Sequence, residues 1–170
     1  MRVSIVIPAH DEEEVLEETV EAAIAGTSEL DREVVVVDDV SSDRTGKIAD
    51  ELAARHPEVR VVHRTKDNSF GNALRHGLAN AEGEIVIPVM ADLCDNMATI
   101  SRMAKVAEET GVAFVVGSRY TPGGSTVDQP RLKGLFSRTY SKVYSLVSGH
   151  AITDITNAFK AYRRESIEGL

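Results

Sequence analysis

Charged side chains stand directly after short apolar runs of this chain, at a spacing that indicates phosphate and cation chemistry. They are Asp38 and Asp39, Asp92 and Asp95, and Arg119. Carboxylates gathered in one place repel one another unless a cation or hydroxyl groups lie among them. A hard divalent ion that bridges a diphosphate satisfies such a cluster best, and an arginine helps to neutralise the phosphate. The pattern therefore predicts a cation and phosphate site, provided that the fold brings these residues together.

The apolar runs alternate with segments of helical periodicity, and these elements must position the charged residues. We expect strands at 3–7, 33–38, 59–63, 84–89 and 112–117, separated by helices. Strand, helix, strand in this order predicts an α/β fold with a Rossmann-like, mostly parallel central sheet flanked by helices. Because parallel strands end at one edge of the sheet, the charged tips are expected to share one crevice.

The helix boundaries are also predicted from the sequence. A capping box of Asp11 and Glu14 is expected to begin the first helix, which ends at Gly26, and Ser42 or Asp43 is expected to cap the second. Two further helices are expected at 70–81 and 96–110, the first of them rich in small residues that allow close packing on the sheet. Another helix is expected to begin near residue 165, where the chain stops, so we expect a C-terminal truncation.

The strand rhythm breaks after Gly117, and a long amphipathic helix is expected at 131–148. The stretch from Gln129 to His150 contains no acidic residue, although it carries Arg131, Lys133, Arg138 and Lys142. Such a basic stretch either contacts phosphate or anionic lipid heads, or forms a solvated helix face. Its apolar side, with Leu135, Phe136 and Tyr140, faces a lipid tail, the core or an interface.

Composition limits the classes of function. The 170 residues suffice for one domain, and 42% hydrophobic with 27% charged residues is typical of a globular protein. The net charge of −8 excludes a strong basic footprint, so we expect no nucleic-acid partner. A single cysteine, Cys94, and the lack of any apolar run of about 18 residues favour a cytoplasmic domain, with contact at the membrane surface left open. Walker A, dinucleotide-binding and Gly-x-Ser-x-Gly motifs are absent.

Four segments, at 6–12, 36–45, 91–93 and 117–120, resemble family 2 glycosyltransferases of the GT-A fold in their order and strand-end placement. Within that family the chain is most similar to the polyprenyl- and dolichyl-phosphate sugar synthases, through Gly123-Gly124-Ser125, Pro130, Asp154 and the segment 159–164. The resemblance covers essentially the whole chain. It implies one GT-A catalytic domain over 1–170, with a nucleotide-sugar-binding part at 1–117 and an acceptor part at 118–170.

The resemblance also implies which residues hold the donor. They are Pro8, Ala9, His10, Glu12, Val37, Asp39 and Ala91, and Val37 is expected to line the nucleotide base. Asp38 either joins them or caps the following turn. Asp92 matches the second acid of the family's Asp-x-Asp motif and is the implied ligand of Mg²⁺ or Mn²⁺, whereas Met90 stands at the first position. Cys94 is a poor ligand for Mg²⁺, and Asp95 is expected to cap the next helix unless it turns inward as a compensating ligand.

Three further residues carry implied roles in the transfer. Arg119 resembles the arginine that faces the donor diphosphate, the alternative being a surface salt bridge, and Lys133 matches a second phosphate-binding position. Asp154 is either a catalytic base or a group that orients Lys or Arg side chains. A phosphate monoester acceptor, with a second pKa of about 6, needs neutralisation more than it needs a base.

The resemblance, together with these residues, implies an inverting transferase that moves a hexose from a GDP- or UDP-sugar to an acceptor, for which polyprenyl phosphate is expected. A family 2 enzyme with a soluble acceptor is one alternative, and it would require Asp154 as a base. A nucleotidyltransferase would need a glycine-rich basic loop after the first strand, which the sequence lacks. A non-catalytic nucleotide-sugar-binding domain is the third alternative, and Met90 in the metal motif is its main support.

Overall fold

A computed structural model of the chain describes residues 1–121, 124 and 131–169, with only the backbone for 131–133. Six strands form one sheet in the order β3-β2-β1-β4-β6-β5. Their bounds are β1 (Arg2–Ala9), β2 (Asp31–Asp39), β3 (Val59–Arg64), β4 (Ile85–Pro88), β5 (Phe114–Val116) and β6 (Lys160–Arg163). The helices are α1 (Leu16–Gly26), α2 (Thr45–Arg55), α3 (Phe70–Asn80), α4 (Ala98–Thr110) and α5 (Arg131–Ser148), followed by a short 3-10 turn, η1 (Arg164–Ser166).

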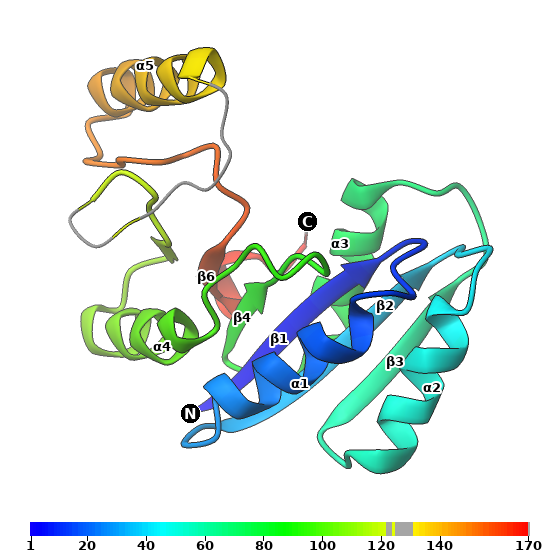
Figure 1. The fold of residues 1–170 in the computed structure, drawn as a ribbon. Helices are drawn as coiled ribbons and strands as arrows, with labels where there is room; N and C mark the ends of the chain where they lie inside the picture. Colours follow the sequence, from blue (N-terminus) through cyan, green and yellow to red (C-terminus); the bar gives the residue numbers. More distant parts are fainter. Residues whose placement is uncertain (122–123, 125–130, 170) are drawn as a thin grey trace.

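The predicted α/β fold with a mostly parallel sheet is confirmed. β1 pairs in parallel with β2 and β4, and β2 pairs in parallel with β3. The exception is β6, which the sequence did not predict and which runs antiparallel to both β4 and β5. Figure 1 shows this late segment returning beside β4, so the end of the chain completes the sheet.

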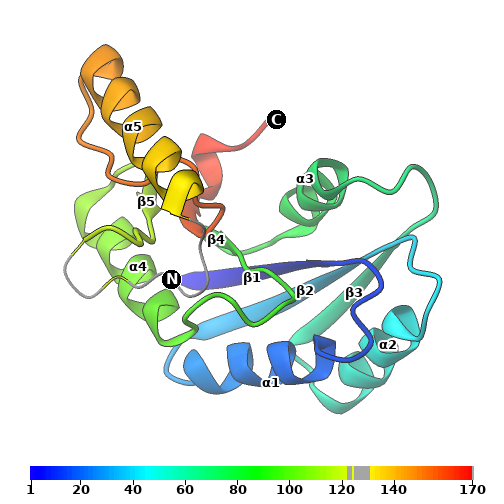
Figure 2. The ribbon, with the colours of Figure 1, turned by 45° about the horizontal axis from the view of Figure 1, so that its top comes forward.

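Helices cover both faces of the sheet, with α1 and α2 on one face and α3 on the other (Figure 2). The larger core cluster includes Leu16, Leu52 and Ile100 from α1, α2 and α4, packed against one face of the strands. The smaller cluster lies beneath α3. There a Cβ added to Gly77 would meet the Val6 side chain at 2.3 Å, so α3 approaches the sheet as closely as its small residues predicted.

Two predicted helix ends are wrong. Asp11 does not cap α1, because its backbone is left-handed (φ 53°) and its carboxylate accepts the Ser42 amide hydrogen at 2.7 Å. The chain then makes a turn before α1 begins at Leu16. Near the C-terminus only the three-residue turn η1 forms where a new helix was expected. In α2 the N-cap position is Arg44, one residue later than predicted, and the Asp43 carboxylate accepts the Thr45 amide hydrogen at 2.9 Å from just before the cap.

The helix α5 stands away from the sheet, as Figure 1 shows. Three serines one turn apart hold it to the segment 152–156. Ser145 bonds the Ile152 backbone in both directions, Ser141 accepts the Ile155 amide hydrogen at 3.2 Å, and Ser137 lies 2.5 Å from the Thr156 hydroxyl. The opposite side, the outer apolar face of α5, is exposed and consists of Leu135, Phe136, Tyr140, Val143, Leu146 and Val147.

This exposure excludes one of the three alternatives for the apolar side of α5, because that side is not part of the core formed by the described residues. A lipid tail and an interface remain. Within the described residues, no helix combines the length and the apolar character needed to cross a bilayer.

Candidate active site

The loops that follow β1 to β4 lie together at the carboxyl edge of the sheet, where the sequence placed the ligand (Figures 1 and 2). Among the described residues, the four non-glycine residues with positive φ are Asp11, Val40, Asp67 and Leu93, one in each of these loops. A left-handed backbone is unfavourable for most residues, and more so for β-branched Val40. Such strain persists only where the surroundings fix it, and it concentrates at functional sites.

Asp39 organises the loop after β3. It is buried, with 2% exposure, and its carboxylate pairs with Arg64 and accepts the Ser69 amide hydrogen at 2.9 Å. The Asp39 carbonyl oxygen lies 2.9 Å from His10 Nδ1. Two predicted donor residues, His10 and Asp39, are therefore in contact. The prediction missed Arg64, which stands at the end of β3 and was identifiable by the same strand-end rule.

Asp38 caps the turn that follows β2, one of the two roles considered for it. Its carboxylate accepts the Ser41 amide hydrogen at 3.2 Å and lies 2.9 Å from His63 Nδ1. Although burial opposes the shift, these hydrogen bonds lower the pKa of Asp38. His63 lies between Asp38 and Asp50, and the hydrogen bond to Asp38 is the main cause that raises the His63 pKa.

The other residues predicted to hold the nucleotide sugar differ in their exposure to solvent. Pro8 pairs with Val37 across β1 and β2, and both Ala9 and Ala91 are buried at the ends of their strands. Val37 is fully buried in the cluster under α3, so its side chain does not reach the crevice as a base-lining residue should. Glu12 follows β1, where its amide hydrogen is donated to the Thr45 hydroxyl at 2.8 Å.

The loop after β4 carries the predicted metal ligand, Asp92, which is exposed. One carboxylate oxygen of Asp92 accepts the Cys94 amide hydrogen at 3.1 Å. Asp95 does not cap α4. Its carboxylate turns back to accept the Met90 amide hydrogen at 2.9 Å. Burial and the charge of Asp92 raise the pKa of Asp95, while Arg119 acts in the opposite direction. Arg119 thus acts electrostatically on the loop that holds Asp92.

The carboxylate oxygens at this edge suit a divalent cation whose remaining coordination positions are filled by substrate phosphates and water. Among the residues that the structure describes, no group of three His, Cys, Asp or Glu side chains is arranged to hold a metal ion. Burial raises the pKa of Glu12, and the charge of Asp92 raises it further, so the two carboxylates share one electrostatic environment. Mg²⁺ is commonly held by one or two carboxylates together with phosphates and water. Loss of hydration and a hydrogen bond to Asp92 raise the pKa of the Cys94 thiol to about 12, which keeps the thiol neutral.

Arg119 and Asp154 form a bidentate pair across the acceptor side of the crevice. The Arg119 Nε and Nη2 atoms lie 2.8 and 2.9 Å from the two carboxylate oxygens of Asp154. Asp154 is fully buried, and the Arg119 side chain is 30% exposed. Burial alone would raise the pKa of Asp154, but the hydrogen bonds and charge of Arg119 lower it. A carboxylate held in this way orients the arginine and is a weak base, which fits the second of the two predicted roles.

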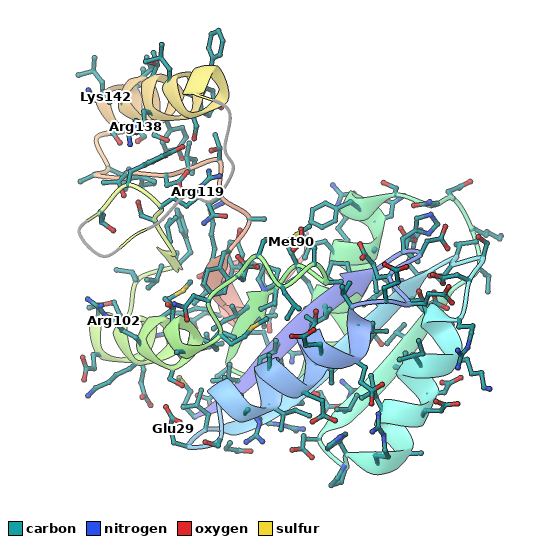
Figure 3. The ribbon with its side chains drawn as sticks, in the orientation of Figure 1. Glu29, Met90, Arg102, Arg119, Arg138 and Lys142 are labelled. Atoms are coloured by element: carbon teal, nitrogen blue, oxygen red, sulfur yellow. The ribbon has the colours of Figure 1, made fainter. Side chains whose placement is uncertain are left out.

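The other acceptor-side predictions are only partly described. Residues 122–123 and 125–130, which include Gly123, Ser125 and Pro130, and the side chain of Lys133 lie outside the described part of the chain. Figure 3 places Met90 near the carboxyl edge and Arg119 between it and α5, which carries Arg138 and Lys142. In this view Arg119 lies on the path from the loop after β4 to α5.

Comparison with known proteins identifies the family of the chain. The family described as glycosyl transferase family 2 matches residues 4–170. A dolichol-phosphate mannosyltransferase of Pyrococcus furiosus is 34% identical over 172 residues, which cover 100% of this chain and 48% of that protein. An undecaprenyl-phosphate mannosyltransferase of Micrococcus luteus is 33% identical, with 100% of this chain and 70% of that protein covered. The chain thus spans about half the length of the first relative.

Solved structures show the same architecture. A mannosyltransferase of Pyrobaculum calidifontis in complex with GDP-Man and Mn²⁺ is 27% identical, with a TM-score of 0.69 over 96% of this chain and 45% of that one. Glucosyl-3-phosphoglycerate synthase from Mycobacterium tuberculosis, with Mn²⁺ and UDP-glucose, has a TM-score of 0.69 at 23% identity over 96% of this chain and 56% of that one. The second likeness concerns the fold alone, and both confirm the predicted GT-A architecture.

Proposed function

The chain belongs to glycosyltransferase family 2, and we propose that it transfers a hexose from a nucleotide diphosphate sugar to polyprenyl phosphate, with inversion at the anomeric carbon. One observation carries the proposal. The loops after the strands place Asp39 and Asp92 at the carboxyl edge of the sheet, where Asp92 acts electrostatically on Glu12 and Arg119, paired with Asp154, acts on Asp95. The names of the two mannosyltransferase relatives favour mannose as the first sugar to test.

Residues 1–117 form the donor part in this proposal. The exposed His10 imidazole is a suitable partner for nucleobase or ribose groups, and the buried Asp39 carboxylate, bonded by Arg64 and the Ser69 amide, would position the loop beside them. Pro8, Ala9, Glu12 and Ala91 complete the strand ends around them.

Asp92 would hold Mg²⁺ or Mn²⁺ together with the diphosphate oxygens, and Glu12 adds a second negative charge nearby. When bound, such an ion stabilises the charge that develops on the leaving diphosphate. Arg119 serves the same purpose from the opposite side, since a guanidinium fixed by Asp154 needs little reorganisation during the reaction. Met90, in place of an acid, leaves fewer protein ligands for the ion.

Residues 118–170 form the acceptor part. A phosphate oxygen of the acceptor attacks the anomeric carbon as the bond to the nucleotide diphosphate breaks, and the leaving group takes the electron pair. A phosphate monoester is mostly dianionic at pH 7, because its second pKa is about 6, so it needs no base. The lowered pKa of Asp154 agrees with a positioning role under Arg119.

Peripheral contact with the cytoplasmic face of a membrane is part of the proposal. The outer apolar face of α5 exposes 67% of Phe136 and 86% of Leu146. Arg138 and Lys142 lie on the same helix, and basic residues beside an apolar face favour an anionic lipid surface.

A transfer assay tests the function. The chain would be incubated with labelled GDP-mannose or UDP-glucose, a divalent ion, and either polyprenyl phosphate or the unphosphorylated polyprenol. We expect labelled lipid only with the phosphate. Transfer to a soluble sugar instead would establish the soluble-acceptor alternative. Binding of the nucleotide sugar without transfer to any acceptor would support the alternative of a non-catalytic nucleotide-sugar-binding domain.

A further inference from the structure

The ends of β2 and β3 are joined by two ion pairs, one on each face of the sheet. In the parallel register of the two strands, Asp38 stands beside His63 and Asp39 beside Arg64. The Asp38 carboxylate lies 2.9 Å from His63 Nδ1, and the Asp39 carboxylate pairs with Arg64. Successive side chains of a strand point to opposite faces, so the two pairs hold the strand ends from both sides. Arginine stays charged at neutral pH, whereas histidine gains or loses its charge there, so only the His63 pair responds to pH.

His63 faces a carboxylate with each of its ring nitrogens. Nδ1 faces Asp38 of β2, and Nε2 lies 3.1 Å from Asp50 of α2. A carboxylate only accepts hydrogen bonds, and a neutral imidazole donates one, so only the doubly protonated imidazole satisfies both neighbours. Among the described residues, the charged groups that face the ring are these two acids, since Lys47 of α2 pairs with Glu51. The arrangement is therefore complete only when His63 carries a positive charge.

Gly46, in the first turn of α2, leaves the space that this pair occupies. Helix α2 packs along β3 (Figure 1). A Cβ added to Gly46 would meet the Asp38 carboxylate at 2.7 Å and the His63 ring at 3.5 Å. Glycine is unfavourable within a helix, so its presence here is explained by the close approach of the His63–Asp38 pair.

Asp38 connects His63 to the loop after β1, which carries two of the residues predicted to hold the nucleotide sugar. The Asp38 carboxylate accepts the Ser41 amide hydrogen at 3.2 Å. The Ser41 hydroxyl in turn accepts the Asp11 amide hydrogen at 3.2 Å, and the Asp11 carboxylate accepts the Ser42 amide hydrogen at 2.7 Å. The turn after β2 thus holds the loop after β1, and His63 holds that turn through Asp38.

The turn after β2 depends on such support, because Val40 within it has a positive φ of 59°. This conformation is unfavourable for a β-branched residue and persists only where the surroundings fix it. Neutral His63 can donate to Asp38 or to Asp50 but not to both, so loss of its second proton weakens the hold on the turn. The fraction of molecules with the loop after β1 in place then falls, and the apparent affinity for a ligand of that loop falls with it.

We propose that His63 is a positioning residue of the nucleotide-sugar site, and that the chain binds the nucleotide sugar more tightly when the His63 imidazole is doubly protonated. The inference rests on the proposed function and deepens it, because it assigns a pH-dependent regulation to the same site. The hydrogen bond to Asp38 is the main cause that raises the pKa of His63 above 6.5. The affinity is therefore highest below pH 6.5 and falls as the pH rises through the folded pKa.

Calorimetric titration with GDP-mannose and UDP-glucose in the presence of Mg²⁺, at about pH 6 and about pH 8.5, tests the inference. H63Q is the site variant. H56Q is the matched control, because His56 also lies 2.9 Å from a carboxylate, that of Glu21, but at the other end of α2. We expect the ratio of the Kd at the higher pH to the Kd at the lower pH to be about threefold larger in the unsubstituted chain and in H56Q than in H63Q, as for the weakening of one hydrogen bond. Effects of other titrating groups are common to all three chains and cancel in this comparison.

Equal ratios in H63Q and H56Q would overturn the inference. A merely structural role of His63 gives this result, because it weakens binding by the same factor at both pH values. A second measurement needs no nucleotide. In an NMR pH titration, the Ser41 amide resonance should follow the titration of the His63 imidazole and lose that step in H63Q, and a Ser41 amide without this step would overturn the inference. Failure of the unsubstituted chain to bind either nucleotide sugar at both pH values would instead count against the proposed function.

Discussion

Residues 1–117 and the described residues of α5 with the segment 149–156 are held in place by different interactions. In the first region, strands such as β1 and β2 bury nearly all their side chains between helices on both faces. In the second region, the described part of α5 leaves its apolar side in solvent and contacts the segment 152–156 through three serines. A buried ion pair, Arg119–Asp154, lies at the centre of this polar network.

The difference indicates that the strand ends are held more rigidly than α5. Apolar burial fixes the strand ends that carry Asp39 and Asp92, because packing in a core tolerates little displacement. Hydrogen bonds fix the acceptor side, and each contributes only about 0.5–1.5 kcal/mol net. The predictions below test this contrast from the largest expected effect to the smallest.

The largest effect is expected in the core of the first region. Ile5 is fully buried in β1, so Ile5→Ala should lower the free energy of unfolding by about 4 kcal/mol through lost burial and a residual cavity. Urea denaturation followed by circular dichroism measures the change. A loss below about 1 kcal/mol would mean that the core of this region is not close-packed.

Asp154→Asn should have the next largest effect, because it leaves the Arg119 guanidinium without its countercharge. We expect a loss of about 3 kcal/mol, at the low end for breaking a buried pair since Arg119 is partly exposed. The same urea experiment should show that the double variant D154N/R119Q recovers part of the loss. Strictly additive losses would contradict the pairing.

A smaller, pH-dependent effect is expected at His63. Because its pKa is raised above 6.5 in the folded chain, its contribution to stability is present below pH 6.5 and is lost as the pH rises through the folded pKa. The unsubstituted chain should therefore exceed His63→Gln in Tm at about pH 5.5, and the difference should shrink at about pH 8.5. A difference of equal size at both pH values would show that His63 is not charged by its contacts with Asp38 and Asp50.

The smallest effect is expected on the outer apolar face of α5. Leu146→Ser should change the free energy of unfolding by no more than about 0.5 kcal/mol, because the side chain is 86% exposed. Comparison with Ile5→Ala in the same urea experiment measures the contrast between the two regions directly. A loss near that of Ile5→Ala would show that this face is covered in solution.

The sequence was sufficient for the parallel part of the fold. The strands predicted at 3–7 and 33–38 became β1 and β2, since a run of Val and Ile that is apolar on both faces fits a covered parallel sheet. It was not sufficient for β6, a four-residue strand with basic residues at both ends, which lacks a clear alternation. The capping role of Asp11 also failed, because a contact with Ser42, 31 residues away, displaced the local one.

The sequence predicted which positions lie at the candidate site, but it did not predict which of those residues contact one another. The strand-end rule predicted the positions of Asp39, Asp92 and Arg119 at or after the ends of β2, β4 and β5, because it depends only on where each strand stops, and their roles stay predictions. The Arg119–Asp154 contact joins residues 35 positions apart and depends on β6 returning to the sheet, which local patterns do not specify. Val37 was assigned to the base through the resemblance alone, whereas its place in a strand that is apolar on both faces agrees with its burial under α3.

The central claim is that the carboxyl edge binds a nucleotide sugar with a divalent ion on Asp92. Calorimetric titration of the chain with GDP- and UDP-sugars, with and without Mn²⁺, tests it most directly. Asp92→Asn is the site variant, and Asp31→Asn, an exposed acid at the opposite end of β2, is the matched control. We expect one nucleotide to bind, more tightly with Mn²⁺, and Asp92→Asn alone to lose the gain from the metal. A folded chain that binds no nucleotide, or a gain from Mn²⁺ that survives in Asp92→Asn, would contradict the account.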